Sequence, residues 1–172
     1  MAQDQAAATP PGEHLVSELK WVHTHLRRDL RTIRNLAAQV RSGARAAVVA
    51  EAVRTLQVRS PLWQLRVNCL RYCQLVHGHH GGEDVLLFPA LRKADRAMGP
   101  VVDRLEADHR RISDLLDEVT ALAELLGSNA GAETRERLVA ALESLGPQLL
   151  EHLAFEEEAI SPTLRQWARW PF

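Results

Sequence analysis

Thiols and aromatic rings are scarce in this sequence. Cys69 and Cys73 are its only cysteines, so neither a disulfide framework nor a four-thiolate zinc site can form. We expect two small buried side chains in a reducing compartment. One Tyr and three Phe stand against eight His. This excess of imidazole points to chemistry at a specific site.

The sequence also lacks an excess of charge and any long apolar run. Its 21 Lys and Arg nearly balance 22 Asp and Glu, for a formal net charge of -1. No global field therefore attracts nucleic acid or an anionic membrane. No apolar run approaches the roughly 18 residues that a membrane helix requires, and the first residues do not form a signal peptide. These absences predict a cytoplasmic protein that binds neither nucleic acid nor membranes.

Apolar residues recur at steps of three and four in four long segments, approximately 14–41, 61–92, 100–126 and 133–165. Glycine- and proline-containing breaks separate them, and strand-like alternation is missing. The pattern predicts an all-α fold, an up-and-down antiparallel four-helix bundle over residues 14–165. Residues 1–13 are expected to be a flexible leader and 166–172 a tail. A shorter pattern from Val48 to Leu56 predicts an extra helix between the first two long ones.

The two halves of the chain resemble each other. His79, Glu83 and Pro89 recur at the same offsets as His152, Glu156 and Pro162. The first and third long helices each carry a central histidine, His23 and His109. We infer two related helical hairpins, which would place equivalent polar residues opposite each other.

Six polar residues interrupt the inward apolar stripes of these helices. His23 lies between Leu19 and Leu26, whereas His25 lies on the flank. The six are His23, His79, Glu83, His109, His152 and Glu156. In an up-and-down bundle their depths from the helix ends nearly coincide, so the side chains can converge on one cluster.

Two buried carboxylates without a cation would be costly, and neither Lys nor Arg lies on these stripes. We therefore expect bound metal. Imidazole and carboxylate without thiolate favour iron or manganese, although zinc is also compatible. The i, i+4 spacing lets each glutamate bridge two metal ions, and open positions would remain for a small ligand.

The set of a lone His, H-x-x-x-E, a second lone His and a second H-x-x-x-E resembles the hemerythrin-like, or HHE cation-binding, domains. Phe88-Pro89-Ala90-Leu91 matches a further run of that family. The resemblance implies a non-haem di-iron site with an oxo or hydroxo bridge. By the resemblance, His23 and His79 bind one iron, His109 and His152 bind the other, and Glu83 and Glu156 bridge them.

One position departs from the oxygen-carrying members of that family. They have a histidine four residues after the lone His of the third helix, where this chain has Ser113. Both irons are then expected to be open. This favours binding of O2, NO or peroxide with a role in redox or gas sensing or stress response. A catalase- or peroxidase-like oxidoreductase and a metal-stapled interaction or iron-storage module are the alternatives, and a protein partner is not identifiable.

Other residues near the predicted site have a structural and a functional interpretation. His80 is predicted to face the edge of the bundle, with a role as an extra ligand or hydrogen-bond donor to a ligand as the alternative. Tyr72 is predicted to be a core residue that could also reach the metal. Gly81 and Gly82 can accommodate a local bulge near the site. Along the same helix, Leu86 and Ala90 are predicted to face inward.

Overall fold

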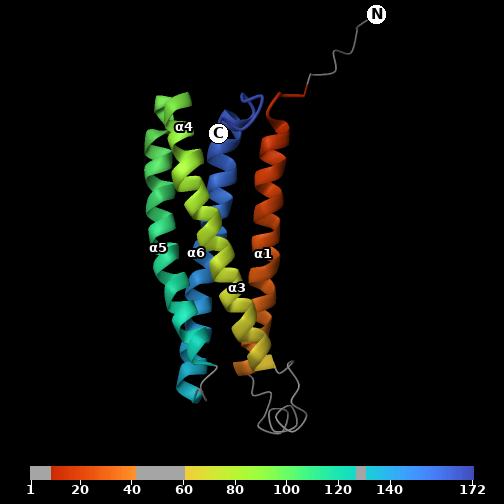
Figure 1. Ribbon diagram of the computed structural model, residues 1–172, viewed down its shortest axis with the longest axis vertical. Coiled ribbons are helices and arrows are strands. Elements are labelled where there is room, and N and C mark those ends of the chain that lie inside the picture. The colour runs from red at the N-terminus through yellow and green to blue at the C-terminus, as the bar shows by residue number, and fades with distance from the viewer. Residues whose placement is uncertain (1–8, 42–60, 127–130) are drawn as a thin grey trace, which may run out of the picture.

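Four long helices run antiparallel in the order of the sequence (Figure 1). The structure is a computed structural model that describes residues 9–41, 61–126 and 131–172. The long helices are α1 (Glu13–Arg41), α3 (Pro61–Gly82), α5 (Gly99–Leu125) and α6 (Ala132–Leu164). Both α1 and α5 pack against α3 and α6, so α1 and α5 lie across a diagonal. The predicted all-α four-helix bundle is confirmed.

The buried apolar residues form two clusters at different levels of the bundle. Leu26, Ile112 and Leu149 belong to the larger cluster, and Phe88 and Leu105 belong to the smaller one. Burial of each such side chain contributes about 1.5–3 kcal/mol relative to exposure. The inward stripes are apolar above and below but polar between the two clusters. The packing of the two clusters therefore fixes the position of the polar level.

A π-helical turn, η1 (Glu83–Leu87), follows α3 and leads into α4 (Phe88–Ala94). The N–H of Phe88 donates to the carbonyl of Glu83, five residues earlier. This extra residue corrects the predicted register: Leu86 is 45% exposed and Ala90 only half-buried, whereas Leu87 and Leu91 are buried. The bulge that Gly81 and Gly82 were expected to accommodate begins directly after them.

Short connections and contacts join the helices at the end of the bundle where residues 9 and 172 lie. A 3-10 turn, η2 (Arg96–Met98), joins α4 to α5. The guanidinium of Arg92 donates to Asp103 over 2.7 Å and so ties α4 to α5. A methyl group at Gly12 would overlap the carbonyl oxygen of Leu164, so a glycine there lets the start of α1 approach α6 closely.

Some predictions fall outside the described residues. They are the extra helix between Val48 and Leu56 and residues 1–8 of the leader. In the described ranges, none of the helices combines the length and the apolar character needed to cross a bilayer.

Candidate metal centre

The polar level between the two apolar clusters holds the six side chains selected from the sequence. They come from all four long helices and the π turn: His23 on α1, His79 on α3, Glu83 on η1, His109 on α5, and His152 and Glu156 on α6. His79 is half-buried and the other five are buried. The bundle thus brings together residues that lie far apart in the sequence, from His23 to Glu156.

The four histidines approach each other in two pairs. His23 Nε2 lies 3.1 Å from His79 Nε2, which joins α1 to α3. His109 Nε2 lies 3.1 Å from His152 Nε2, which joins α5 to α6. Each pair presents two ring nitrogens at a separation that suits two neighbouring ligands of one ion.

The two glutamates connect the pairs. Glu83 Oε1 is 3.3 Å from His79 Nε2, and its Oε2 is 3.6 Å from His109 Nε2. Glu156 Oε2 is 3.4 Å from His23 Nε2 and 3.7 Å from His152 Nε2. Each carboxylate therefore faces one histidine of each pair, and the six residues close into a ring.

All four carboxylate oxygens of this ring are buried and, among the described residues, have no hydrogen-bond partner. A buried carboxylate without a partner carries a large desolvation cost. Bound divalent cations would offset that cost, and four imidazoles with two carboxylates are ligands that first-row divalent metals accept. The donor set therefore fits bound metal.

Carboxylates also bind the outer nitrogens of two ring histidines. His23 Nδ1 donates to Glu157 over 2.9 Å, and His109 Nδ1 donates to Asp84 over 2.8 Å. With the proton on Nδ1, the lone pair of Nε2 points into the ring. Arg27 donates to the same Glu157 oxygen over 2.6 Å and offsets its charge. These contacts orient the two imidazoles with their Nε2 atoms toward the other residues of the ring.

Comparison with protein-family models matches residues 14–164 to the hemerythrin HHE cation-binding domain, which is most of the chain. The chain belongs to this family. Comparisons with curated proteins and with solved structures gave no match. The family description names cation binding, which agrees with the ring of histidines and unpaired carboxylates. The expected hemerythrin-like family is thus confirmed.

The electrostatics of this hemerythrin domain favour neutral imidazoles. Burial lowers the pKa of His23 to about 2, of His109 to about 3, and of His79 and His152 to about 4. Neutral imidazole is the form that binds metal, so protons compete weakly for these nitrogens at neutral pH. Without a cation, burial raises the pKa of Glu156 to about 8, and that of Glu83 also lies well above its usual value.

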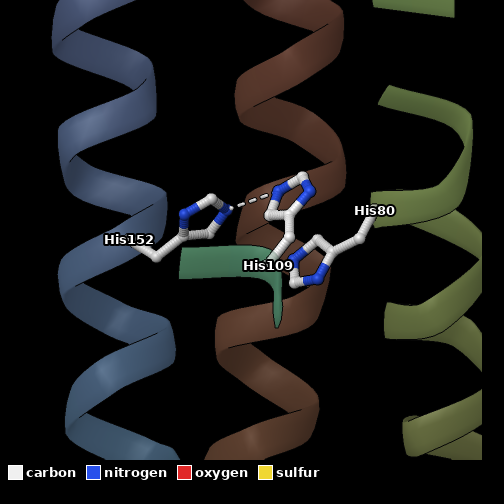
Figure 2. A group of neighbouring side chains, drawn as sticks. All are labelled: His80, His109 and His152. Atoms are coloured by element: carbon white, nitrogen blue, oxygen red, sulfur yellow. Dashed lines mark hydrogen bonds between the residues drawn. The ribbon is translucent and has the colours of Figure 1, made fainter. Parts of the chain in front are cut away.

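His80 does not face the edge of the hemerythrin bundle, so that prediction is wrong. It is 5% exposed, and its ring stacks on His109 with the centroids 3.9 Å apart (Figure 2). The physical reason is that α3 packs against both α1 and α5. Successive residues of a helix point about 100° apart, so His79 faces His23 on α1 while His80 faces His109 on α5.

The remaining candidates have neighbours other than the six ring residues. Tyr72 is buried in the larger apolar cluster, as predicted for a core residue. The Ser113 hydroxyl lies 3.5 Å from His77 Nδ1, on a partly exposed face. His25 stays on the flank, where its Nδ1 donates to the Trp21 carbonyl over 2.8 Å.

A surface cavity of about 290 Å³ reaches the edge of the centre beside His152. Asp108 lines it, with its Oδ2 3.9 Å from His152 Nδ1, and is ion-paired to Arg104 and Arg111. The cavity therefore brings solvent and a carboxylate close to the outer nitrogen of one ring histidine.

Sequence reasoning missed the three carboxylates behind the ring: Asp84, Asp108 and Glu157. Asp84 directly follows Glu83, and Glu157 directly follows Glu156. The signal that could have found these two is the repeated acidic residue after each H-x-x-x-E, which places a carboxylate toward the neighbouring helix. Asp108, beside His109, has no counterpart beside His23, where Val22 occupies the equivalent position.

Proposed function

We propose that this hemerythrin-domain protein holds two iron ions and binds a small ligand, O2, NO or peroxide, at an open position of the pair. The proposed role is redox or gas sensing, including response to oxidative stress. The observation that carries the proposal is Glu83, whose two oxygens face His79 and His109 on opposite sides of the centre. This arrangement suits a carboxylate that bridges two ions.

The proposed ligand set follows the two histidine pairs. His23 and His79 would hold one ion, His109 and His152 the other, and Glu83 and Glu156 would bridge them. Two divalent ions bridged by Glu83 and Glu156 would neutralise the carboxylate charge that the protein interior otherwise has to bury. Iron is proposed over manganese or zinc because an imidazole and carboxylate set with open positions is typical of non-haem iron proteins.

The chain contributes orientation and exclusion of water. When bound, an iron pair supplies electrons and open coordination positions. Glu157 and Asp84 hold the Nδ1 protons of His23 and His109, which keeps both Nε2 lone pairs directed inward. The apolar clusters on either side limit the entry of water, so a small uncharged ligand is favoured over larger anions.

A second candidate function is peroxide consumption, as in a catalase- or peroxidase-like oxidoreductase. The cavity beside His152 favours it, because Asp108 connects solvent to the outer edge of the centre. Conversion of two H2O2 to O2 and two H2O requires protons to move between oxygen atoms, and the buried carboxylate of Asp108 can hold one in transit.

Anaerobic loading with Fe(II) tests both candidates. We expect two irons per chain by elemental analysis and a near-ultraviolet absorption change on adding O2, NO or H2O2. Spectral change without steady O2 release from peroxide supports the sensing role, whereas steady release that is lost in Glu83→Ala supports the enzyme. Two tightly bound metals with neither response would contradict both and leave the metals a structural or storage role.

A further inference from the structure

His80 is a buried polar residue that the proposed ligand set does not use. It is 5% exposed, and its Nε2 is buried with no hydrogen-bond partner in the described parts of the chain. A buried ring nitrogen without a partner costs free energy, and this one needs an acceptor, a donor or a metal ion.

The surroundings of His80 are other imidazoles. Its ring lies parallel to that of His109, at 9°, and its centroid is 5.1 Å from that of His152. Figure 2 shows the three rings drawn together from α3, α5 and α6. One nitrogen from each of the three rings lies within 4.8 Å of the others.

We propose that His80 is a third imidazole ligand of the ion held by His109 and His152. The inference rests on the metal pair of the proposed function and adds a residue to it. Two ligands on opposite sides of an ion with metal–nitrogen bonds of about 2.1 Å are about 4.2 Å apart. Neighbouring ligands of such an ion are about 3 Å apart. His109 and His152 already have this separation, so the His80 ring has to tilt out of its stack on His109 and its nitrogen has to move by at most about 2 Å.

Among the described residues, the other half of the centre has no equivalent imidazole. Leu153 follows His152 as His80 follows His79, and Leu153 is a buried core residue. Around His23 and His79 the grouped ligands are two imidazoles with Glu83 and Glu156. The metal pair is therefore asymmetric, and the ion bound by His23 and His79 keeps more open positions for the small ligand.

The asymmetry also compensates for Ser113. The hydroxyl of Ser113 turns toward His77 and adds no nitrogen to the centre. The additional imidazole beside His109 comes from His80 on α3 instead.

His80→Leu tests the assignment, and His77→Leu is its matched control. Both remove one imidazole from α3, but His77 contacts Asp117 and Ser113 outside the centre. Calorimetric titration with Co(II) should show that His80→Leu lowers the affinity for one of the two ions at least about tenfold. The other ion and both ions of His77→Leu should keep wild-type affinity. The metal-free His80→Leu protein should melt no lower than wild type, because it loses an unpartnered polar atom.

A second measurement does not depend on any variant. In zinc-loaded protein with 15N-labelled histidine, the Nε2 resonance of His80 should shift on metal binding together with those of His109 and His152. An unshifted His80 resonance with unchanged affinities in His80→Leu overturns this inference and leaves the metal pair intact. A wild-type protein that binds at most one ion overturns the proposed function itself.

Discussion

The two halves of the centre are built from the same sequence pattern but differ in what surrounds them. His23 is held by Glu157, which Arg27 also binds, whereas His109 is held by the more exposed Asp84. The side chain of Glu157 is 19% exposed and that of Asp84 is 43% exposed. In the part of the chain that the structure describes, His80 stacks on His109, and no further imidazole stacks on His23 or His152. The same motif thus occurs in one half where the histidine is held by a less exposed carboxylate, and in another half that has one more imidazole.

The largest effect is expected from the removal of a residue that both halves of the centre share. Glu156→Ala takes away the carboxylate that faces both His23 and His152, so both ions should be lost and iron should fall below one per chain. Elemental analysis after dialysis measures this. Retention of two irons would show that Glu156 does not connect the halves. Far-ultraviolet circular dichroism confirms that the variant remains helical.

Acidification tests whether both halves depend on neutral imidazoles. In the metal-free protein the pKa of His152 is lowered from 6.5 to about 4 in the fold, so the unfolded chain binds the extra proton between these values. This one group contributes about 3 kcal/mol above pH 6.5 that is lost as the pH falls to about 4. His23, His79 and His109 act in the same direction. We therefore expect unfolding on acidification, measured by urea titration at each pH.

The buried carboxylates change the stability of the metal-free protein with pH in the opposite direction. The pKa of Glu156 is raised from 4.5 to about 8, so the folded metal-free chain retains a proton that the unfolded chain releases. Above pH 6.5 the histidines no longer contribute to the slope, and stability should decline as the pH rises to about 8. Bound metal keeps the carboxylate ionised and should abolish the decline. A flat profile in the metal-free protein would contradict the buried, unpaired state of Glu156.

Single histidine removals separate the halves. His79→Ala should lower the affinity for the ion of the His23 half by about 100-fold or more and leave the other ion bound. His152→Ala should do the reverse. Titration with Co(II) resolves the two affinities. Simultaneous loss of both ions in each variant would mean that the centre binds metal only as a unit.

Substitution of the carboxylates behind the ring should have smaller effects. Glu157→Gln and Asp84→Asn each weaken the contact that keeps the proton of one histidine on Nδ1. A loss of about tenfold in metal affinity is typical of such a change. Glu157→Gln should have the larger effect because Glu157 is less exposed and is held by Arg27. Equal effects would contradict the difference in orientation between the halves.

The smallest expected effect is that of His25→Ala. His25 contacts Trp21 on the flank of α1, two residues from His23 but outside the ring. Iron content should stay within error of wild type. A sharp loss of iron would move the site away from the inward stripe of α1.

The sequence predicted the bundle and the convergence of six residues because apolar spacing defines which side of each helix faces inward. Leu19 and Leu26 bracket His23, and the same argument places the other five. It failed at Leu86, because a π turn adds a residue that periodicity cannot reveal. It failed at His80, because a helix between two neighbours buries two adjacent positions rather than one. Asp108 was missed because apolar periodicity does not mark it, although Arg104 and Arg111 lie four residues before and three residues after it on the same helix.

Anomalous diffraction at the iron edge from crystals of the iron-loaded protein tests the central claim most directly. We predict two peaks inside the ring, one bonded to His23 and His79, the other to His109 and His152, and both bonded to Glu83 and Glu156 at about 2.0–2.2 Å. A single peak, or iron bound outside this ring, would contradict the account.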